Sequence, residues 1–363
     1  MKSSQPLVFG IPGPTLNKET RKMIEEVQPG GFILFTRNIE NPQRLRDLMD
    51  ELRSLSKIEP VLTIDQEGGR VSRLKVIGKE PPNANQLRDK NDEELITRHG
   101  KLMGELLRHM GFNLNLCPVV DISFDDQADN SLFGRTWGKT PDEVIQKAGL
   151  FARGLQSTGV LSCGKHFPAY SGCDVDPHHE LPIVQRSYEE LDNCEWKPYK
   201  ELFKELDTIM IGHALYPQID DSKLPASLSS KMINEILKQK IGFKGIVVSD
   251  DLDMGAITEH YSFSDAIRLS LIAGNDLLLI CHRTQLAYEA AEVCAKLDSE
   301  IMNEKLERIA KFKKRLAPPT EFSIERWNEL NHQVYKLRED TLGVEAAKEN
   351  SPEGGKRSPV EVF

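Results

Sequence analysis

Short apolar runs alternate with longer amphipathic segments along most of this chain. The runs are rich in β-branched residues, and the segments between them repeat their apolar positions with helical period. Several runs are apolar at nearly every position, as in strands that are buried on both faces of a parallel sheet. The predicted strands are residues 7–11, 31–36, 60–65, 113–122, 160–166, 208–213, 245–250 and 276–281. The predicted helices are residues 18–27, 42–55, 92–110, 141–155, 188–206, 231–241 and 263–274.

This alternation predicts the fold class and the domain organisation. Eight successive βα units match an α/β protein of the (β/α)8 TIM-barrel type, which typically takes about 250 residues. We therefore expect residues 1–345 to form one catalytic domain with parallel strands and an active site at the C-terminal strand ends. Residues 346–363 are rich in charge, Gly, Ser and Pro, so we predict a disordered tail there.

The charge and the apolar content of the chain argue against nucleic-acid and membrane partners. Lys and Arg number 47 against 56 Asp and Glu, for a net charge of -9, whereas a nucleic-acid binder needs a basic surface to neutralise phosphates. The first residues lack the apolar core of a signal peptide, and no run approaches the roughly 20 apolar residues of a membrane span. We expect a cytoplasmic protein with no membrane or nucleic-acid partner. The sequence does not indicate an oligomeric state.

Ionisable residues stand where most of the predicted strands end. The carboxyl ends of barrel strands meet at one face, where the active sites of such barrels lie. Charged side chains gathered at one face lower the stability of the fold unless they form ion pairs or bind a ligand. Their presence therefore indicates a polar active site. The residues at these ends are Asp65, Asp121, Lys165, His166, His213, Asp250 and Asp251.

Two kinds of chemistry suit such a set. Five of the nine histidines lie in or just after these strand ends, and with Asp250 they could bind zinc. The first strand lacks the HxH pair of metal-dependent hydrolase barrels, however, and the Lys and Arg residues of the same rim would repel a divalent ion. The six cysteines form no CxxC pair, and they are interpreted as reduced thiols rather than nucleophiles. Carbohydrate chemistry explains this combination of acids, cations and histidines at the strand ends better than a metal site does. Ring hydroxyls need Asp, Arg, Lys and His as hydrogen-bond partners.

Several motifs resemble one enzyme family. The segment KHFPAYSGCDVDPHHELP resembles the KHFPGHG…D-S-H…LP signature of the β-N-acetylglucosaminidase branch of glycoside hydrolase family 3. Further matches follow the same order as in that family. They are DQEGGRVSRL (65–74), FGRTW (133–137), GHALYPQID…PASLS (212–229), GFKGIVVSDDLDMGAI (242–257) and AGNDLLLI (273–280).

The resemblance implies a retaining mechanism in two steps. Asp250, the first acid of SDDL, would attack the anomeric carbon, and Asp251 would orient the loop. The acid/base would be His178, with Asp176 two residues earlier fixing its tautomer. An imidazole suits this role because its ordinary pKa lies near 6.5. Two alternatives stay open, namely that Asp250 only caps a helix and that His179 is the acid/base.

The resemblance also implies a set of sugar-binding residues. Because the rim is cationic and shows no ligand constellation, we expect no metal, and no cofactor is expected either. For Arg73 and Lys165 the alternative role is an ion pair at the rim with Asp65 or Glu67, and His213 is expected to be structural. The implied partner is a small carbohydrate with terminal β-linked N-acetylglucosamine, from peptidoglycan or chitin fragments. The implied sugar-binding residues are Asp65, Arg73, Arg135, Lys165 and His166.

One segment departs from the family pattern. Residues 169–172 are AYSG where the family has GHGD, and Pro177 replaces the serine of the acid/base pair. Fewer glycines and a proline stiffen this loop and favour an extended conformation at Asp176. The sequence therefore does not indicate which leaving group the loop accepts. A phosphorylase or β-glucosidase of the same family remains an alternative. A barrel that only binds sugar would have no need of Asp250 or the Asp176/His178 pair.

Overall fold

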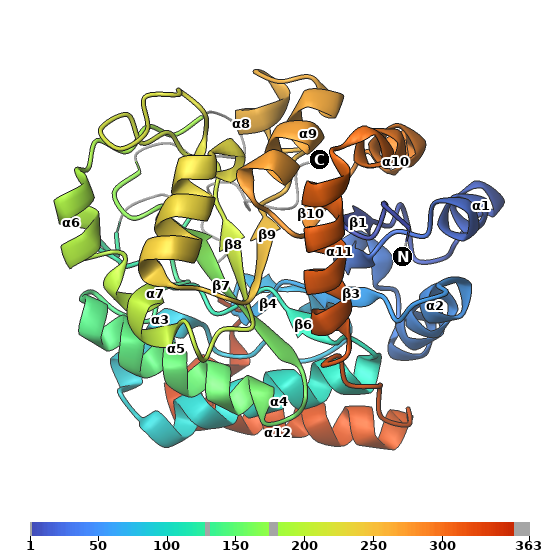
Figure 1. The fold of residues 1–363 in the computed structure, drawn as a ribbon. Coiled ribbons are helices and arrows are strands. Elements are labelled where there is room, and N and C mark those ends of the chain that lie inside the picture. The colour runs from blue at the N-terminus through green and yellow to red at the C-terminus, as the bar shows by residue number, and fades with distance from the viewer. Residues whose placement is uncertain (1, 128–130, 174–180, 352–363) are drawn as a thin grey trace.

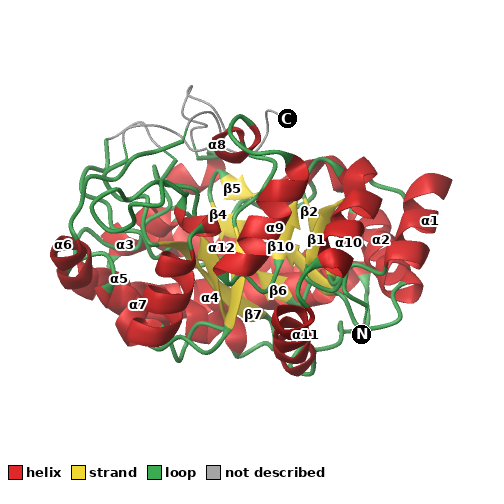
Figure 2. Ribbon diagram, turned by 45° about the horizontal axis from the view of Figure 1, so that its top comes forward, coloured by secondary structure: helices red, strands yellow, loops and turns green. Residues whose placement is uncertain are grey.

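The computed structural model describes residues 2–127, 131–173 and 181–351. Within them, eight parallel strands form one sheet in the order β10-β1-β2-β3-β6-β7-β8-β9 (Figures 1 and 2). The (β/α)8 prediction is confirmed. The strands are β1 (Leu7–Gly10), β2 (Gly31–Leu34), β3 (Val61–Ile64), β6 (Leu114–Asn115), β7 (Leu161–Phe167), β8 (Thr208–Ile211), β9 (Ile246–Ser249) and β10 (Leu278–Ile280).

The sheet closes on itself between β9 and β10. Val248 bridges Leu277 in parallel, and the Ser249 N–H donates to the Leu277 carbonyl at 2.9 Å. The side chains that point into the barrel form their own apolar cluster, which Ile309 and Phe312 join from one end of it. The barrel interior is therefore a packed core, as in other barrels of this kind. The strand residues of this cluster include Val8, Ile33, Val61, Leu114, Leu161, Cys163, Met210, Ile246, Val248 and Leu279.

Amphipathic helices cover the outside of the barrel (Figure 2). Most begin with an Asn, Asp, Ser or Thr cap whose side chain accepts a backbone N–H of the first turn. The segment Lys231–Ile241 is wound as a π-helix. The other helices before β10 are α1 (Lys18–Val27), α2 (Pro42–Leu55), α3 (Ala84–Lys90), α4 (Glu93–Met110), α5 (Pro141–Gln156), α6 (Tyr188–Asn193), α7 (Lys197–Leu202), α8 (Gly255–Thr258) and α9 (Phe263–Ala273).

Two predicted elements differ from the structure, and proline explains both. The strand expected over residues 113–122 pairs regularly only over Leu114–Asn115, because Pro118 has no N–H to donate. Pairing resumes at Val119, which bridges Lys165. The helix expected over residues 188–206 is split into α6 and α7, with Pro198 in the first turn of α7, where a proline is tolerated.

Three helices that the alternating pattern did not predict follow β10. They are α10 (Ala287–Lys296), α11 (Ser299–Lys313) and α12 (Ile324–Leu342), and α12 lies along α4 (Figure 1). The first six residues of the predicted tail, 346–351, pack on this part of the fold. The Ser351 N–H donates to Glu80 at 2.8 Å, and the guanidinium of Arg338 contacts both Glu80 and the carbonyl of Ala347. The rest of the predicted tail lies outside the described residues.

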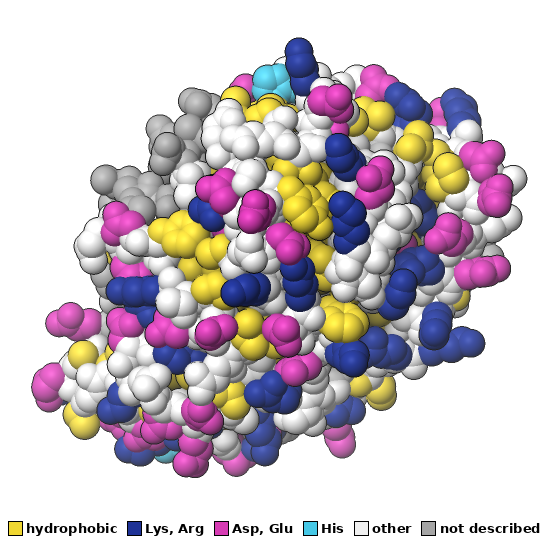
Figure 3. All heavy atoms as spheres, turned by 60° about the vertical axis from the view of Figure 1, so that its left-hand side comes forward, with side chains coloured by type: hydrophobic (Ala, Val, Ile, Leu, Met, Phe, Trp, Pro, Cys, Tyr) yellow, Lys and Arg dark blue, Asp and Glu magenta, His cyan; other side chains and the backbone are white. Residues whose placement is uncertain are grey.

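The face that carries α5, α6 and α7 shows basic and acidic side chains interspersed with small apolar patches (Figure 3). Such a face offers no continuous basic stripe along which a phosphate backbone could bind. Within the described parts of the chain, no helix combines the length and the apolar composition needed to cross a bilayer.

Candidate active site

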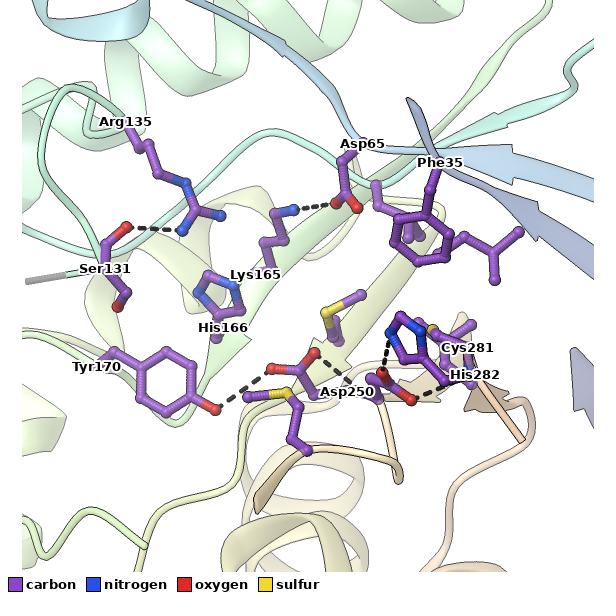
Figure 4. A pocket seen from close by; sticks show the side chains of 16 residues that line it. Phe35, Asp65, Ser131, Arg135, Lys165, His166, Tyr170, Asp250, Cys281 and His282 are labelled. Carbon is purple, nitrogen blue, oxygen red and sulfur yellow. Dashed lines mark hydrogen bonds and ion pairs between the residues drawn. The ribbon is translucent and has the colours of Figure 1, made fainter. Parts of the chain in front are cut away.

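One pocket lies over the C-terminal strand ends, where the polar residues were predicted to meet (Figure 4). Its floor is the apolar end of the barrel core, and its walls carry acids, cations and aromatic rings. A sugar also has apolar ring faces and polar edges, so this mixed lining suits one. The lining residues are Ile33, Phe35, Asp65, Leu116, Ser131, Arg135, Lys165, His166, Tyr170, Met210, Asp250, Asp251, Met254, Leu279, Cys281 and His282.

A buried ionic network forms one wall of the pocket. The Lys165 ammonium lies 2.6 Å from an Asp65 carboxylate oxygen and 2.7 Å from Glu67. The Arg135 guanidinium donates to both Glu67 oxygens, at 2.9 and 2.8 Å, and to the Ser131 carbonyl at 2.7 Å. All four charged side chains are nearly inaccessible to solvent. Bonds between charged partners are short and directional, so this wall is rigid.

The network also keeps its members charged. Burial alone would raise the pKa of Glu67, but the positive charges and hydrogen bonds of Arg135 and Lys165 lower it well below its usual range. In the same way burial would lower the pKa of Lys165, and the carboxylates of Asp65 and Glu67 raise it instead. Both side chains are therefore ionised at neutral pH.

A short hairpin positions Glu67. Strands β4 (Gln66–Gly68) and β5 (Val71–Ser72) pair antiparallel directly after β3, and the turn between them begins at Gly68, whose φ of 123° favours glycine. The Asn115 side chain holds Gln66 at both its N–H and its carbonyl, each at 3.0 Å. His99, which is fully buried, contacts the Glu67 carbonyl at 2.9 Å. Glu67 is thus fixed from two neighbouring elements.

Asp121 orients the next strand end. Its Oδ2 atom accepts the His166 backbone N–H at 2.9 Å and lies 2.8 Å from His166 Nδ1, and its Oδ1 atom accepts the Tyr170 N–H at 2.6 Å. The Asp121 side chain is completely buried. One carboxylate therefore fixes both the imidazole that lines the pocket and the start of the loop after β7.

Asp250 faces the ionic wall from the end of β9 (Figure 4). Its N–H donates to the Ile211 carbonyl at 2.9 Å, which continues the pairing with β8. Its Oδ1 atom accepts the Asp251 N–H at 2.9 Å, and its Oδ2 atom lies 3.3 Å from the Tyr170 hydroxyl. Helix α8 is capped at Met254 instead. Asp250 is therefore not a helix cap, and it lies in the pocket with both oxygens oriented.

Asp251 has a different environment from its neighbour. Its Oδ1 atom accepts the N–H groups of Asp253 and Cys281, at 2.9 and 3.1 Å, and its carbonyl lies 2.9 Å from the His213 ring. Burial, with the nearby charge of Asp253, raises the pKa of Asp251. A carboxyl group that holds its proton is a poor nucleophile. Asp251 ties the loop after β9 to β10 and to His213, which is itself buried.

Residues 4–312 match the family described as Glycosyl hydrolase family 3 N terminal domain. The chain belongs to glycosyl hydrolase family 3. A β-hexosaminidase of Pseudomonas aeruginosa is 34% identical over 277 residues, which are 76% of this chain and 82% of the relative. A β-hexosaminidase of Vibrio cholerae is 32% identical over 337 residues, covering 92% of this chain and 98% of the relative. This family 3 chain is accordingly a glycoside hydrolase.

Solved structures of family 3 enzymes have the same fold. The β-N-acetylglucosaminidase of a Paenibacillus species is 30% identical, with a TM-score of 0.86 over 93% of this chain and 68% of that one. NagZ from Neisseria gonorrhoeae is 27% identical, with a TM-score of 0.78 over 92% of this chain and 97% of that one. The barrel and its strand ends are therefore shared across most of each chain.

The structure brings most of the predicted site residues together. Asp65, Arg135, Lys165, His166 and Asp250 all line the pocket. Arg73 lies next to two residues that line the pocket, with its guanidinium 3.8 Å from the Asp65 carboxylate and 6.0 Å from the Phe35 ring. The ion pair with Asp65, the alternative role for Arg73, is therefore present.

The alternative role for Lys165, an ion pair with Asp65 or Glu67, is also present, and it coexists with a place in the pocket. The predicted acid/base pair, Asp176 and His178, lies outside the described residues, and so does His179.

Several pocket residues, Phe35 and Tyr170 among them, were missed by sequence reasoning. The Phe35 ring follows β2 and lies 5.7 Å from the ring of His282, one of the histidines predicted at the strand ends, with the two planes tilted by 30°. Tyr170 contacts Asp250. A position just after a strand was the available signal for Phe35. Tyr170 was noticed only as a departure from the family pattern. Among the residues that the structure describes, no three His, Cys, Asp or Glu side chains are arranged to hold a metal ion.

The ionic wall makes a prediction about stability. Glu67→Gln should lower the free energy of unfolding by about 3 kcal/mol, because removing one partner of a buried charge network leaves the others uncompensated. Urea unfolding at neutral pH measures this. Glu105→Gln is the matched control, since its ion pair with Arg326 is partly exposed and should contribute at most about 1 kcal/mol. Equal losses in the two variants would contradict the central role of Glu67.

Proposed function

We propose that this glycoside hydrolase is a retaining exo-enzyme that removes terminal β-linked N-acetylglucosamine. The observation that carries the proposal is the placing of Asp250 opposite Asp65, Arg135, Lys165 and His166 in one pocket. The relatives support the choice of sugar, because they are named β-hexosaminidases and β-N-acetylglucosaminidases. NagZ from Neisseria gonorrhoeae has also been solved with N-trifluoroacetyl-D-glucosamine.

The first chemical step forms a glycosyl-enzyme. An Asp250 carboxylate oxygen attacks the anomeric carbon, and the bond from that carbon to the leaving oxygen breaks while His178 protonates that oxygen. In the second step a water molecule, deprotonated by the same imidazole, attacks the anomeric carbon and releases Asp250. Two displacements at one carbon restore its configuration.

The described residues on both sides of the acid/base segment are tied to the chain that follows β7 and β8. On one side the Cys173 N–H donates to the carbonyl of Tyr170, which lines the pocket, at 3.0 Å. On the other side the Pro182 carbonyl accepts the N–H of Leu215, which follows β8, at 2.8 Å. Since β7 and β8 are the two strands before the one that ends at Asp250, these contacts support His178 and Asp176 as the acid/base pair.

The ionic wall is suited to hold the sugar. Asp65 accepts from ring hydroxyls, and the cations Lys165 and Arg135 and the imidazole of His166 donate to hydroxyl or acetamido oxygens. The apolar floor then contacts a ring face. Because these side chains already fix one another, the site loses little conformational entropy when the sugar binds.

We further propose that the enzyme acts in the cytoplasm on peptidoglycan or chitin fragments. The six cysteines are all free thiols, which suits a reducing compartment. The net acidity of the chain is compatible with a small, soluble carbohydrate substrate.

The choice of sugar is tested with a panel of 4-nitrophenyl β-glycosides in phosphate-free buffer. The N-acetylglucosaminide should be cleaved with a kcat/KM on the order of 100-fold above the glucoside and xyloside, because those lack the acetamido group for which the site supplies partners. Preference for glucoside would indicate a β-glucosidase. Product formation that requires added phosphate would indicate a phosphorylase.

The nucleophile is tested by substitution and by trapping. Asp250→Ala should lower kcat by roughly 10⁴-fold, because the covalent route is lost, whereas Asp251→Asn should cost much less. A 2-deoxy-2-fluoro or 5-fluoro glycosyl fluoride should label the wild-type chain, since fluorine slows both steps while the good leaving group keeps the first one accessible. Peptide mass mapping should find the label on the GIVVSDDLDM peptide. A label on Asp65 or Asp176, or product of inverted configuration, would contradict the mechanism.

The acid/base is tested by comparing two adjacent histidines. His178→Ala should slow turnover by roughly 10²- to 10⁴-fold, the usual range for a general acid/base. The loss should be smallest for substrates whose leaving group needs little protonation. His179→Ala should lower turnover of the same substrates only slightly. If the two variants exchange these phenotypes, His179 rather than His178 carries the proton.

A further inference from the structure

Tyr170 connects three successive strand ends of the barrel. It belongs to the loop after β7, its hydroxyl accepts the His213 N–H at the end of β8 at 2.5 Å, and the same hydroxyl lies 3.3 Å from Asp250 Oδ2 at the end of β9. A phenol oxygen that accepts from one side directs its own proton to another. The hydroxyl proton therefore points from Tyr170 toward the Asp250 carboxylate.

The ring is held in this place by several contacts. The Tyr170 N–H donates to Asp121, and the ring packs against the His166 imidazole at 4.8 Å between centroids. Gly212 makes room for it, because a Cβ atom there would lie 2.6 Å from Tyr170 Cζ. The Tyr170 side chain is almost completely buried. Its position is therefore determined by the fold and not by free rotation in the pocket.

We propose that Tyr170 is a positioning residue for the nucleophile, holding the Asp250 carboxylate ionised and aimed through a donated hydrogen bond. This inference rests on the proposed function, in which Asp250 is glycosylated and then released. In the release step the bond between the anomeric carbon and the Asp250 oxygen breaks, and its electron pair returns to the carboxylate. A hydroxyl donor at Oδ2 stabilises that charge.

The geometry leaves room for this bond to strengthen. Its length of 3.3 Å exceeds the usual value of about 2.8 Å for a hydroxyl donor, and catalytic hydrogen bonds commonly shorten when substrate binds. Asp250 Oδ1 already accepts the Asp251 N–H. With both oxygens held, the carboxylate plane is fixed relative to the pocket.

Other ionisable groups also face Asp250, so the test must separate Tyr170 from them. A change confined to the Tyr170 hydroxyl leaves their number and charge unchanged. The groups that share the pocket with Asp250 are Asp65, Arg135, Lys165, His166, Asp251, Cys281 and His282.

Tyr170→Phe removes only the hydroxyl. The acidic limb of the pH profile of kcat/KM should move to higher pH by about one unit, because the charged carboxylate loses a donor. With an activated aryl leaving group, for which release of the sugar limits turnover, kcat should fall roughly 10- to 100-fold. Gly212→Ala, which displaces the ring, should shift the acidic limb in the same direction.

Tyr216→Phe is the matched control. Tyr216 is equally buried and its hydroxyl contacts the backbone of Ala169, so its loss disturbs the same loop without touching Asp250. This variant should leave the acidic limb in place even if its melting temperature falls. A merely structural role for Tyr170 predicts that the two variants behave alike, and that outcome would overturn the proposal.

A measurement without substrate separates this inference from the proposed function. The carboxyl ¹³C signal of Asp250, assigned by its loss in Asp250→Asn, can be followed against pH in selectively labelled protein. Its titration should shift to higher pH in Tyr170→Phe and not in Tyr216→Phe. A wild-type chain that cleaves no glycoside of the panel would contradict the proposed function alone. An unshifted titration in Tyr170→Phe would overturn the role of Tyr170, whatever the substrate.

Discussion

A lysine ammonium buried at the mouth of the barrel is the constraint on which the site depends. Lys165 is only 2% exposed, and a lone charge in that position would strongly destabilise the fold. Asp65 and Glu67 balance it, and Arg135 balances the second carboxylate, so two cations and two anions compensate one another. This requirement fixes β3, the β4–β5 hairpin, the loop after β6 and the end of β7 relative to one another.

The two adjacent aspartates after β9 show how environment divides one residue type between two tasks. Asp250 faces the pocket, where donors orient both of its oxygens. Asp251 turns toward β10 and accepts backbone N–H groups beside another carboxylate, which raises its pKa. Both acids line the pocket, and the backbone at this strand end places Asp250 against Tyr170 and Asp251 against β10.

Sequence reasoning located the strands and the strand-end residues because both follow from local pattern. Apolar runs predict buried strands, and strand order predicts that Asp65, Lys165 and Asp250 share a face, as the structure confirms. Contacts between distant segments carry no such signal. The two bonds from Arg135 to Glu67 and the reach of Tyr170 to the end of β9 depend on how loops meet in space. The contact of Arg73 with Asp65 is the alternative role that the sequence offered for this residue, and its place at the sugar stays a prediction.

Ile309 and Phe312 close the barrel at the end opposite the pocket, because their helix α11 contacts Gln5 and Asp276, which precede β1 and β10. Within the described residues the interior is packed from these two side chains up to the pocket floor, so a ligand reaches the floor from the side of the C-terminal strand ends. In the proposed mechanism the leaving fragment, the attacking water and the released sugar would then all pass on that side. The sugar held against the floor would be the last of them to depart.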